Sequence, residues 1–451
     1  NMSSAININN MFDGCLNFNQ PLNNWDVSKV KNMSSLFSSA SAFNQPLNKW
    51  NTNSVIKMNN LFRNAKKFNQ EINNFNVSNV PNLSSVFSNA ESFNQSLDNW
   101  DTSSCTNMSF MFYNAKKFNK DLSNYNVSNV KNMNGMFEGD AEFNQDLDSW
   151  NVSKVTNFKS MFRFATKFNG NISKWNTQSA TDLSFMFSNA SNFKQELSSW
   201  NTSKVTNLKC IFNSADIFDS NLANWDTKNV VDLDFAFSNA TKFSSDLSKW
   251  DVMKLDDASG MFNNVRLSIS NYSDTLIGWA NENVKNNVVF DGGDSKYESY
   301  AIDARNLLTN KYNWTITDGG GASLANYFVT PLVIIFNQNK NVFDIEVDLT
   351  TNPHGTVVFD IINNEQSTVN LSTNTLTFNE SDYKKTKIFT VSATKENIQS
   401  SIINGVITIE VNKEKSVSSY SNLLPTSISV SSVGNSNFLV SDNNISITLN
   451  S

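Results

Sequence analysis

The chain has 451 residues, of which 39% are hydrophobic, so it is long enough to form two or three domains with hydrophobic cores. Its formal net charge is −6 and only 17% of its residues are charged, with no basic cluster, which argues against nucleic acid as a partner. No apolar run approaches the ~20 residues that span a bilayer, so we expect no membrane-spanning segment.

Residues 1–267 repeat with a period of 25 residues and no insertions. Two phenylalanine series keep this period, one starting at Phe12 and the other at Phe18, and an aromatic column starts at Trp25. Burying about seven large side chains per copy would contribute roughly 10–20 kcal/mol. Ordering the backbone of 25 residues costs roughly 25–50 kcal/mol. One copy therefore cannot fold alone, and the sequence predicts a solenoid in which each copy packs on its neighbours.

Each copy changes its pattern along its length. Apolar and polar residues alternate around "NWDVS" at 24–28, which predicts a short parallel strand with one buried face. Apolar residues at 33, 36, 37 and 40 have the spacing of one helical stripe, and Asn32 is placed as the N-cap of that short helix. The expected buried positions of one copy are Phe18, Leu22, Trp25, Val27, Val30, Met33, Leu36, Phe37 and Ala40.

The segment "FNQPLNNWDVSKVKNMSSLF" at 18–37 resembles the BspA-like leucine-rich-repeat surface protein family, whose repeat also occurs in mycoplasma lipoproteins and in secreted proteins of Bacteroidota. The resemblance implies a leucine-rich-repeat-like solenoid at the cell surface or outside the cell. Two departures leave the curvature open, because Trp25 replaces the usual aliphatic residue and Val30 stands where many such repeats carry Asn or Cys. The chain opens in the middle of a copy, so we expect a fragment of a longer polypeptide.

Residues 268–320 lose the strict period and are expected to cap the solenoid. A helix is predicted around 276–283 and a strand at "NVVFDGG", followed by a helix around 301–311 and "NWTITDGG". The segment "GGGAS" at 319–323 is expected to be a flexible junction.

Residues 324–415 are predicted to form an all-β sandwich. Five alternating segments, "VFDIEVDL", "GTVVFDII", "NTLTFN", "KTKIFTVSA" and "NGVITIEVN", are separated by turn residues. They resemble the Calx-beta or immunoglobulin-like modules of bacterial adhesins. Residues 416–451 are interpreted as a linker and the start of a further module, because "ISITLNS" echoes "IEVDLTT"; alternatively, this last strand completes the first sandwich.

The sequence offers little catalytic chemistry, so we expect no enzyme and no cofactor. His354 is the only histidine and lies in a turn motif without a nucleophile pattern. The acids fall mostly on polar repeat positions. The "DGGD" segment at 291–294 and the group Asp251, Asp256 and Asp257 are weak calcium candidates with too few ligands, and a tight turn is favoured for the former.

Two further groups of residues are interpreted as structural. The phenylalanine and tryptophan columns could be stacking platforms for sugars or bases, but their inward positions favour a core. Cys15, Cys105 and Cys210 have no paired spacing for zinc or disulfides and are expected to be small packing residues.

The residue after each aromatic of the Trp25 column is always Asn or Asp. On a parallel sheet these side chains would form one polar ladder along the strand face, where they either hydrogen-bond among themselves and to the next corner or bind a ligand. The ladder consists of Asp26, Asn51, Asn76, Asp101, Asn126, Asn151, Asn176, Asn201, Asp226 and Asp251.

The resemblance, together with this extended surface, implies a non-catalytic segment of a bacterial cell-surface or secreted adhesin. Its partners would be glycans or proteins of host or neighbouring-cell surfaces, bound by multivalent contact. The alternative is a structural subunit or stalk of a surface filament or surface layer, which would contact other copies. A repeat domain attached to an enzyme outside this chain is a third hypothesis.

Overall fold

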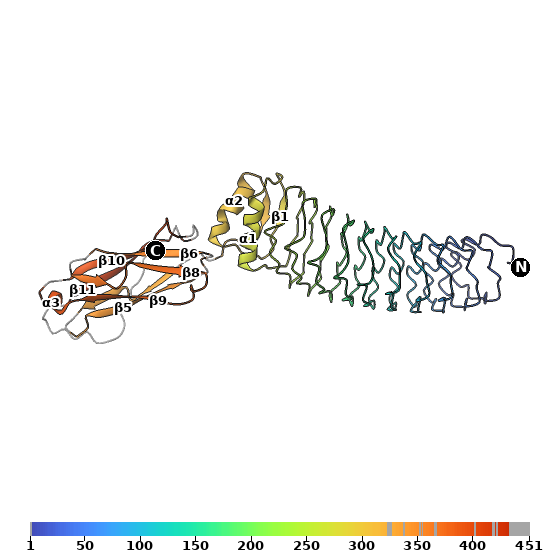
Figure 1. Cartoon of the computed structure of the whole chain (residues 1–451), viewed down its shortest axis with the longest axis horizontal. Helices are drawn as coiled ribbons and strands as arrows, with labels where there is room; N and C mark the ends of the chain where they lie inside the picture. Colours follow the sequence, from blue (N-terminus) through green and yellow to red (C-terminus); the bar gives the residue numbers. More distant parts are fainter. Residues whose placement is uncertain are drawn as a thin grey trace. The chain divides into compact units, whose positions relative to one another are not determined.

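The chain is described by a computed structural model that covers residues 2–322, 327–336, 339–350, 353, 355–364, 368–400, 403–416, 420 and 423–432. His354 and the "ISITLNS" segment lie outside these residues. The chain divides into two compact units between Ala322 and Ser323. Figure 1 shows stacked coils and a helical end in the first unit, and β-strands in the second.

Residues 2–267, here called the repeat stack, form 25-residue coils joined by backbone hydrogen bonds. Ser35 donates its N–H to the carbonyl of Asn59 in the next coil at 3.0 Å, and Phe37 donates to Leu61 at 3.0 Å. Single parallel β-bridges join Asn7 to Asn32 and continue at the same position of the later coils. The 25-residue repeat is therefore confirmed. The predicted strand and helix of each copy are wrong, since the described coils consist of turns, single β-bridges and segments without regular secondary structure.

Left-handed residues explain why no helix forms in the coils. Two positions in every coil have a positive φ, represented by Ser35 (φ 57°) and Ser39 (φ 57°). A right-handed helix cannot pass through such residues. Asn32 nevertheless makes the hydrogen bond expected of a cap, because its Oδ1 accepts the N–H of Ser34 at 3.0 Å. With left-handed residues at these two positions, every second backbone N–H donates to the next coil, and the intervening N–H groups bond within their own coil.

The predicted core positions are buried in the inner coils. Phe37 and Phe62 of successive coils stack with ring centroids 5.6 Å apart and an interplanar angle of 3°. Phe37 also stacks on Phe43, six residues later in the chain, at 4.0 Å. In the first coil Phe18 and Trp25 are only partly buried. The phenylalanine and tryptophan columns are thus core and not stacking platforms.

The indoles of the aromatic column also link the coils. The Nε1–H of Trp150 donates to the carbonyl of Leu122 in the preceding coil at 2.9 Å, and most other tryptophans of the column repeat this bond. Tyr125 occupies the same column, and its buried hydroxyl has no hydrogen-bond partner among the described residues. A buried hydroxyl without a partner destabilises the folded state.

Tyr125→Phe is therefore expected to raise the free energy of unfolding of the first unit by about 1 kcal/mol. The wild-type chain already carries Phe75 at this position of another coil. Urea denaturation followed by tryptophan fluorescence measures the effect, because all ten tryptophans lie at or before Trp314 and report on this unit alone. Trp150→Phe is the matched control and should be destabilising, because it removes a hydrogen bond that is made. A lower stability of Tyr125→Phe would contradict the prediction.

The repeat stack ends in two helices and two short strands. The first helix, predicted around 276–283, begins earlier and spans Ile269–Ala280, whereas the second lies close to the predicted range 301–311. The strands continue the line of β-bridges, since Ala258 bridges to Phe290 and β1 pairs in parallel with β2. Trp279 extends the indole bonding by donating to the carbonyl of Leu247 at 3.1 Å. The elements are α1 (Ile269–Ala280), β1 (Val289–Asp291), η1 (Ser299–Ala301), α2 (Ile302–Asn310) and β2 (Thr315–Thr317).

The second unit contains two mainly antiparallel sheets whose side chains share one hydrophobic cluster. One sheet has the order β4-β11-β10-β6-β8 and the other β3-β5-β9-β7. The elements are β3 (Tyr327–Thr330), β4 (Val333–Phe336), β5 (Val342–Leu349), β6 (Thr356–Asn363), β7 (Val369–Leu371), β8 (Thr375–Asn379), β9 (Lys387–Ala393), α3 (Lys395–Ser400), β10 (Asn404–Val411) and β11 (Thr426–Ser432).

The five strands predicted for the second unit correspond to β5, β6, β8, β9 and β10. Four strands and the helix α3 were not predicted individually. β11 pairs with both β10 and β4. Residues 426–432 therefore add a strand to this unit, where the sequence predicted a linker and the start of a further module.

Candidate functional site

The ten Asn and Asp residues from Asp26 to Asp251, here called the Asx row, form one turn per coil. In each, a side-chain oxygen accepts the backbone N–H two residues later at 2.9–3.3 Å, as Asp26 does from Ser28. Such Asx turns are the structural alternative that the sequence left open. Seven of the ten residues are exposed and three are half-buried.

The Asx row does not lie on a strand face. The expected ladder on a parallel sheet is wrong, because the β-bridges that join the coils lie at the position of Asn32 instead. Hydrogen bonds from the Ser28 side chain and backbone lower the pKa of Asp26, and those from Ser103 lower the pKa of Asp101. The row thus presents six amides and four carboxylates, and the lowered pKa of Asp26 and Asp101 keeps these two charged at neutral pH.

A second asparagine series, which sequence reasoning missed, bonds the coils directly to one another. Asn19 Oδ1 accepts the N–H of Asn44 at 2.9 Å, and Asn44 Oδ1 does the same for Asn69. In the later "FNQ" motifs the glutamine reaches back to the preceding coil, as Gln95 Nε2 does to Asn69 Oδ1 at 3.0 Å. The recurrence of "FNQ" in the sequence is the signal that could have revealed this role.

The weak calcium candidates are engaged in separate local contacts. Asp291 Oδ1 accepts the N–H of Gly293, which has a φ of 61°, so "DGGD" forms a tight turn. Asp256 pairs with Lys285, and Asp257 bonds to Ser259. Among the described residues, no group of three His, Cys, Asp or Glu side chains is placed to hold a metal ion.

Only one of the three cysteines is a buried packing residue. Cys105 is buried, whereas Cys15 is exposed and Cys210 is half-buried, so the expectation is wrong for these two. All three are free thiols. Burial raises the pKa of Cys105 and of Cys210 to about 11, which keeps both as unreactive thiols at neutral pH.

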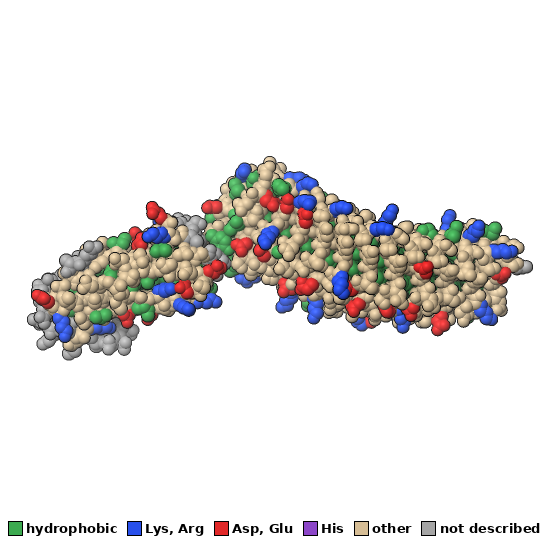
Figure 2. Space-filling model, viewed as in Figure 1, with side chains coloured by type: hydrophobic (Ala, Val, Ile, Leu, Met, Phe, Trp, Pro, Cys, Tyr) green, Lys and Arg blue, Asp and Glu red, His purple; other side chains and the backbone are tan. Residues whose placement is uncertain are grey.

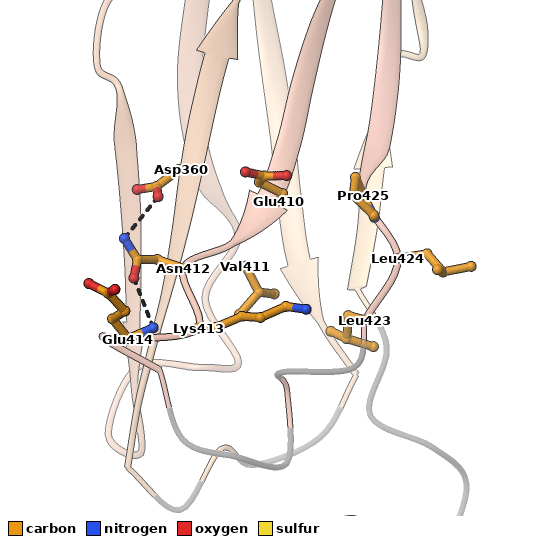
Figure 3. Close-up of a pocket in the computed structure, with 9 residues that line it drawn as sticks. All are labelled: Asp360, Glu410, Val411, Asn412, Lys413, Glu414, Leu423, Leu424 and Pro425. Atoms are coloured by element: carbon orange, nitrogen blue, oxygen red, sulfur yellow. Dashed lines mark hydrogen bonds between the residues drawn. The ribbon is translucent and has the colours of Figure 1, made fainter.

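The second unit contains an open cavity of about 470 Å³ between β6, β10 and residues 423–425. Asp360 and Glu410 face each other across the paired strands, and Asn412 Nδ2 donates to Asp360 Oδ2 at 2.8 Å (Figure 3). Leu424 points away from the cavity and is 82% exposed. Two carboxylates held this way do not form a recognisable catalytic arrangement.

Comparison with protein families gives three overlapping matches to the family described as "Mycoplasma protein of unknown function, DUF285", at residues 1–100, 82–200 and 181–295. No curated protein matches the chain. The crystal structure of the periplasmic chaperone SfaE is similar at 8% identity over 25% of this chain, with a TM-score of 0.18, which is too low to support an inference. The match spans 59% of the chaperone chain. Among the described residues, no helix is long and apolar enough to cross a membrane.

Proposed function

Because the chain belongs to the DUF285 family, we propose that it is a non-catalytic segment of a bacterial cell-surface or secreted adhesin. Residues 1–267 would act as a BspA-like solenoid, and the two-sheet unit as an immunoglobulin-like or Calx-beta-like β-sandwich that serves as a stalk. The partners would be glycans or proteins on host or neighbouring cells. The place of action would be outside the cell.

The observation that supports this proposal most is the uniformity of the repeat stack. Every coil of the row presents the same turn geometry, so the Asx row repeats Asn or Asp side chains in one arrangement along the stack. A ligand with repeated units could contact several coils at once, and the resulting avidity would exceed the strength of any single contact. On the face drawn in Figure 2, charges of both signs are scattered and no large cluster of one sign is seen, which suits neutral or mixed-charge partners.

A variant that keeps the turns tests whether the Asx row makes the contact. Changing five exposed asparagines to aspartate retains each side-chain acceptor but removes the amide donors and adds five charges. We expect at least a tenfold loss of binding by beads coated with the full chain to epithelial or bacterial cells, with an unchanged urea midpoint. The residues are Asn51, Asn126, Asn151, Asn176 and Asn201.

The control variant substitutes asparagines of the series that begins at Asn19, which bond the coils to one another. It should lower the stability of the protein and leave binding by the folded protein unchanged. Unchanged adhesion by the Asx-row variant would exclude this row as the contact surface. Failure of the wild-type chain to adhere to any cell, combined with filament formation in solution, would favour the structural-subunit alternative.

A further inference from the structure

Four phenylalanines occupy backbone positions that suit them poorly. Phe110, Phe164, Phe185 and Phe235 have φ values of 56°, 58°, 61° and 52°. The same positions in the other coils hold Asn, Ser, Gly or Cys. A bulky residue in the left-handed region is an outlier that costs on the order of 1–3 kcal/mol.

Burial does not offset this strain. Phe164 is 43% exposed and Phe235 is 38% exposed, while Phe110 and Phe185 are half-buried. None of the four belongs to the hydrophobic cluster of the first unit. The four side chains, here called the aromatic row, therefore carry a backbone cost and leave apolar surface accessible without adding to this hydrophobic cluster. Strained residues of this kind are typical of functional sites.

Glycines in the following coil make room for two of the rings. A Cβ atom at Gly135 would lie 2.5 Å from Cδ1 of Phe110, and a Cβ atom at Gly260 would lie 2.5 Å from Cε1 of Phe235. Each of these two rings therefore lies against the backbone of the following coil at its glycine. Both glycines have positive φ values, which glycine adopts without strain, so the backbone of the following coil is unstrained beneath these two rings.

The polar groups beside the aromatic row neutralise one another. The Arg163 guanidinium lies 4.8 Å from the ring centroid of Phe164 and 5.2 Å from that of Phe185. Arg163 pairs with Glu138 at 3.2 Å, and Lys209 pairs with Asp234. A surface whose charges are paired internally offers no attraction for a polyanion or a polycation.

We propose that the aromatic row binds a neutral, extended glycan, a proposal that rests on the proposed function of the repeat surface. The four rings lie on coils that are two, one and two steps apart, so they extend over about 24 Å at the usual spacing of paired strands. Flat rings match the apolar C–H faces of sugar rings. Paired Arg163 and Glu138 supply a donor and an acceptor for hydroxyl groups. A peptide anchor would instead call for a pocket that encloses one side chain.

The test measures binding of the full chain to a printed array of neutral hexasaccharides built from glucose, mannose, galactose or N-acetylglucosamine. The variant replaces all four phenylalanines with serine. Serine already occupies the two corresponding repeat positions in another coil, as Ser35 and Ser39. We expect the wild type to bind at least one glycan and the variant to lose at least tenfold in affinity. The variant should keep or raise the urea midpoint, because serine relieves strain. The control, Ser35→Asn with Ser85→Asn, changes the same positions in coils without these aromatics and should bind normally.

Three results would overturn the inference. The first is a wild-type chain that adheres to cells but binds no neutral glycan, which leaves the proposed function intact. The second is equal glycan binding by the four-serine variant. The third is adhesion that depends on the four rings yet is abolished by protease treatment of the cells and survives periodate oxidation, which would identify a protein partner. Glycan binding without cell adhesion would support the inference while contradicting the proposed function.

Discussion

Asp318→Ala is expected to lower the free energy of unfolding of the first unit by about 3–5 kcal/mol. The Asp318 side chain is 3% exposed and accepts from Arg305 Nε at 2.8 Å. It also accepts from the Tyr272 hydroxyl at 2.9 Å and from the N–H of Gly320 at 3.0 Å. Removing the carboxylate leaves the Arg305 guanidinium without its charge partner and leaves the buried Tyr272 hydroxyl without its acceptor. Urea denaturation followed by tryptophan fluorescence measures the loss.

Two controls separate the charge effect from a general loss of packing. Arg305→Met combined with Asp318→Leu removes both charges and should be less destabilised than Asp318→Ala, because no uncompensated charge stays buried. Lys167→Gln breaks an ion pair with Glu142 whose side chains are 57% and 48% exposed, and should change stability by about 0–1 kcal/mol. An unchanged midpoint for Asp318→Ala would refute the role of this pair in closing the end of the stack.

The sequence predicted the parts of the fold that depend on side-chain burial. The period, the columns of Phe37 and Trp50, the helices α1 and α2 and five strands of the second unit all follow from the spacing of apolar residues. The strand and helix predicted for each coil are wrong. A run of turns with residues 33, 36, 37 and 40 pointing inward has the same apolar spacing as a helix, so the apolar pattern cannot distinguish the two. Asn, Ser and Gly at the positions of Ser35 and Ser39 were the available signal for left-handed backbone.

The candidate site was harder to predict because its features are departures from the repeat. The uniform Asx row is visible in the sequence, but its hydrogen bonds to residues two positions later require the three-dimensional turn. The aromatic row is a set of four exceptions at the positions of Ser35 and Ser39, which lie outside the predicted core positions of the repeat. The backbone conformation of all four and the exposure of Phe164 and Phe235 then show that these rings do not belong to the buried columns.

Asp140→Ala is expected to stabilise the first unit, and by more at high pH than at low pH. Asp140 is fully buried and neither carboxyl oxygen has a hydrogen-bond partner among the described residues. The same position holds alanine in both neighbouring coils, at Ala115 and Ala165. An unsatisfied buried polar group costs about 1–3 kcal/mol, so the alanine variant should gain about that much where the carboxyl is protonated.

The pH dependence follows from the raised pKa of Asp140. Burial, and then the nearby charge of Glu142, raise the pKa of Asp140 well above its usual value in the folded state. Near pH 4 and below, the group is protonated in the folded state and increasingly so in the unfolded state, whose pKa is about 3.9. As pH rises from there to the folded pKa, the unfolded state loses its proton first, so wild-type stability falls throughout that window. The advantage of Asp140→Ala should therefore grow between pH 4 and pH 8.

Asp140→Asn distinguishes the charge from the missing hydrogen bonds. The amide cannot ionise but still has no partner in the core, so this variant should lose the pH dependence and keep the unsatisfied group. Asp140→Asn should consequently be more stable than wild type at pH 8 and about as stable as wild type at pH 4. At both pH values it should be less stable than Asp140→Ala. Urea midpoints of the three proteins across this pH range decide the matter. A gain by Asp140→Ala that stays constant with pH would show that the buried carboxyl does not titrate there, because a group with a raised folded pKa must couple folding to proton uptake.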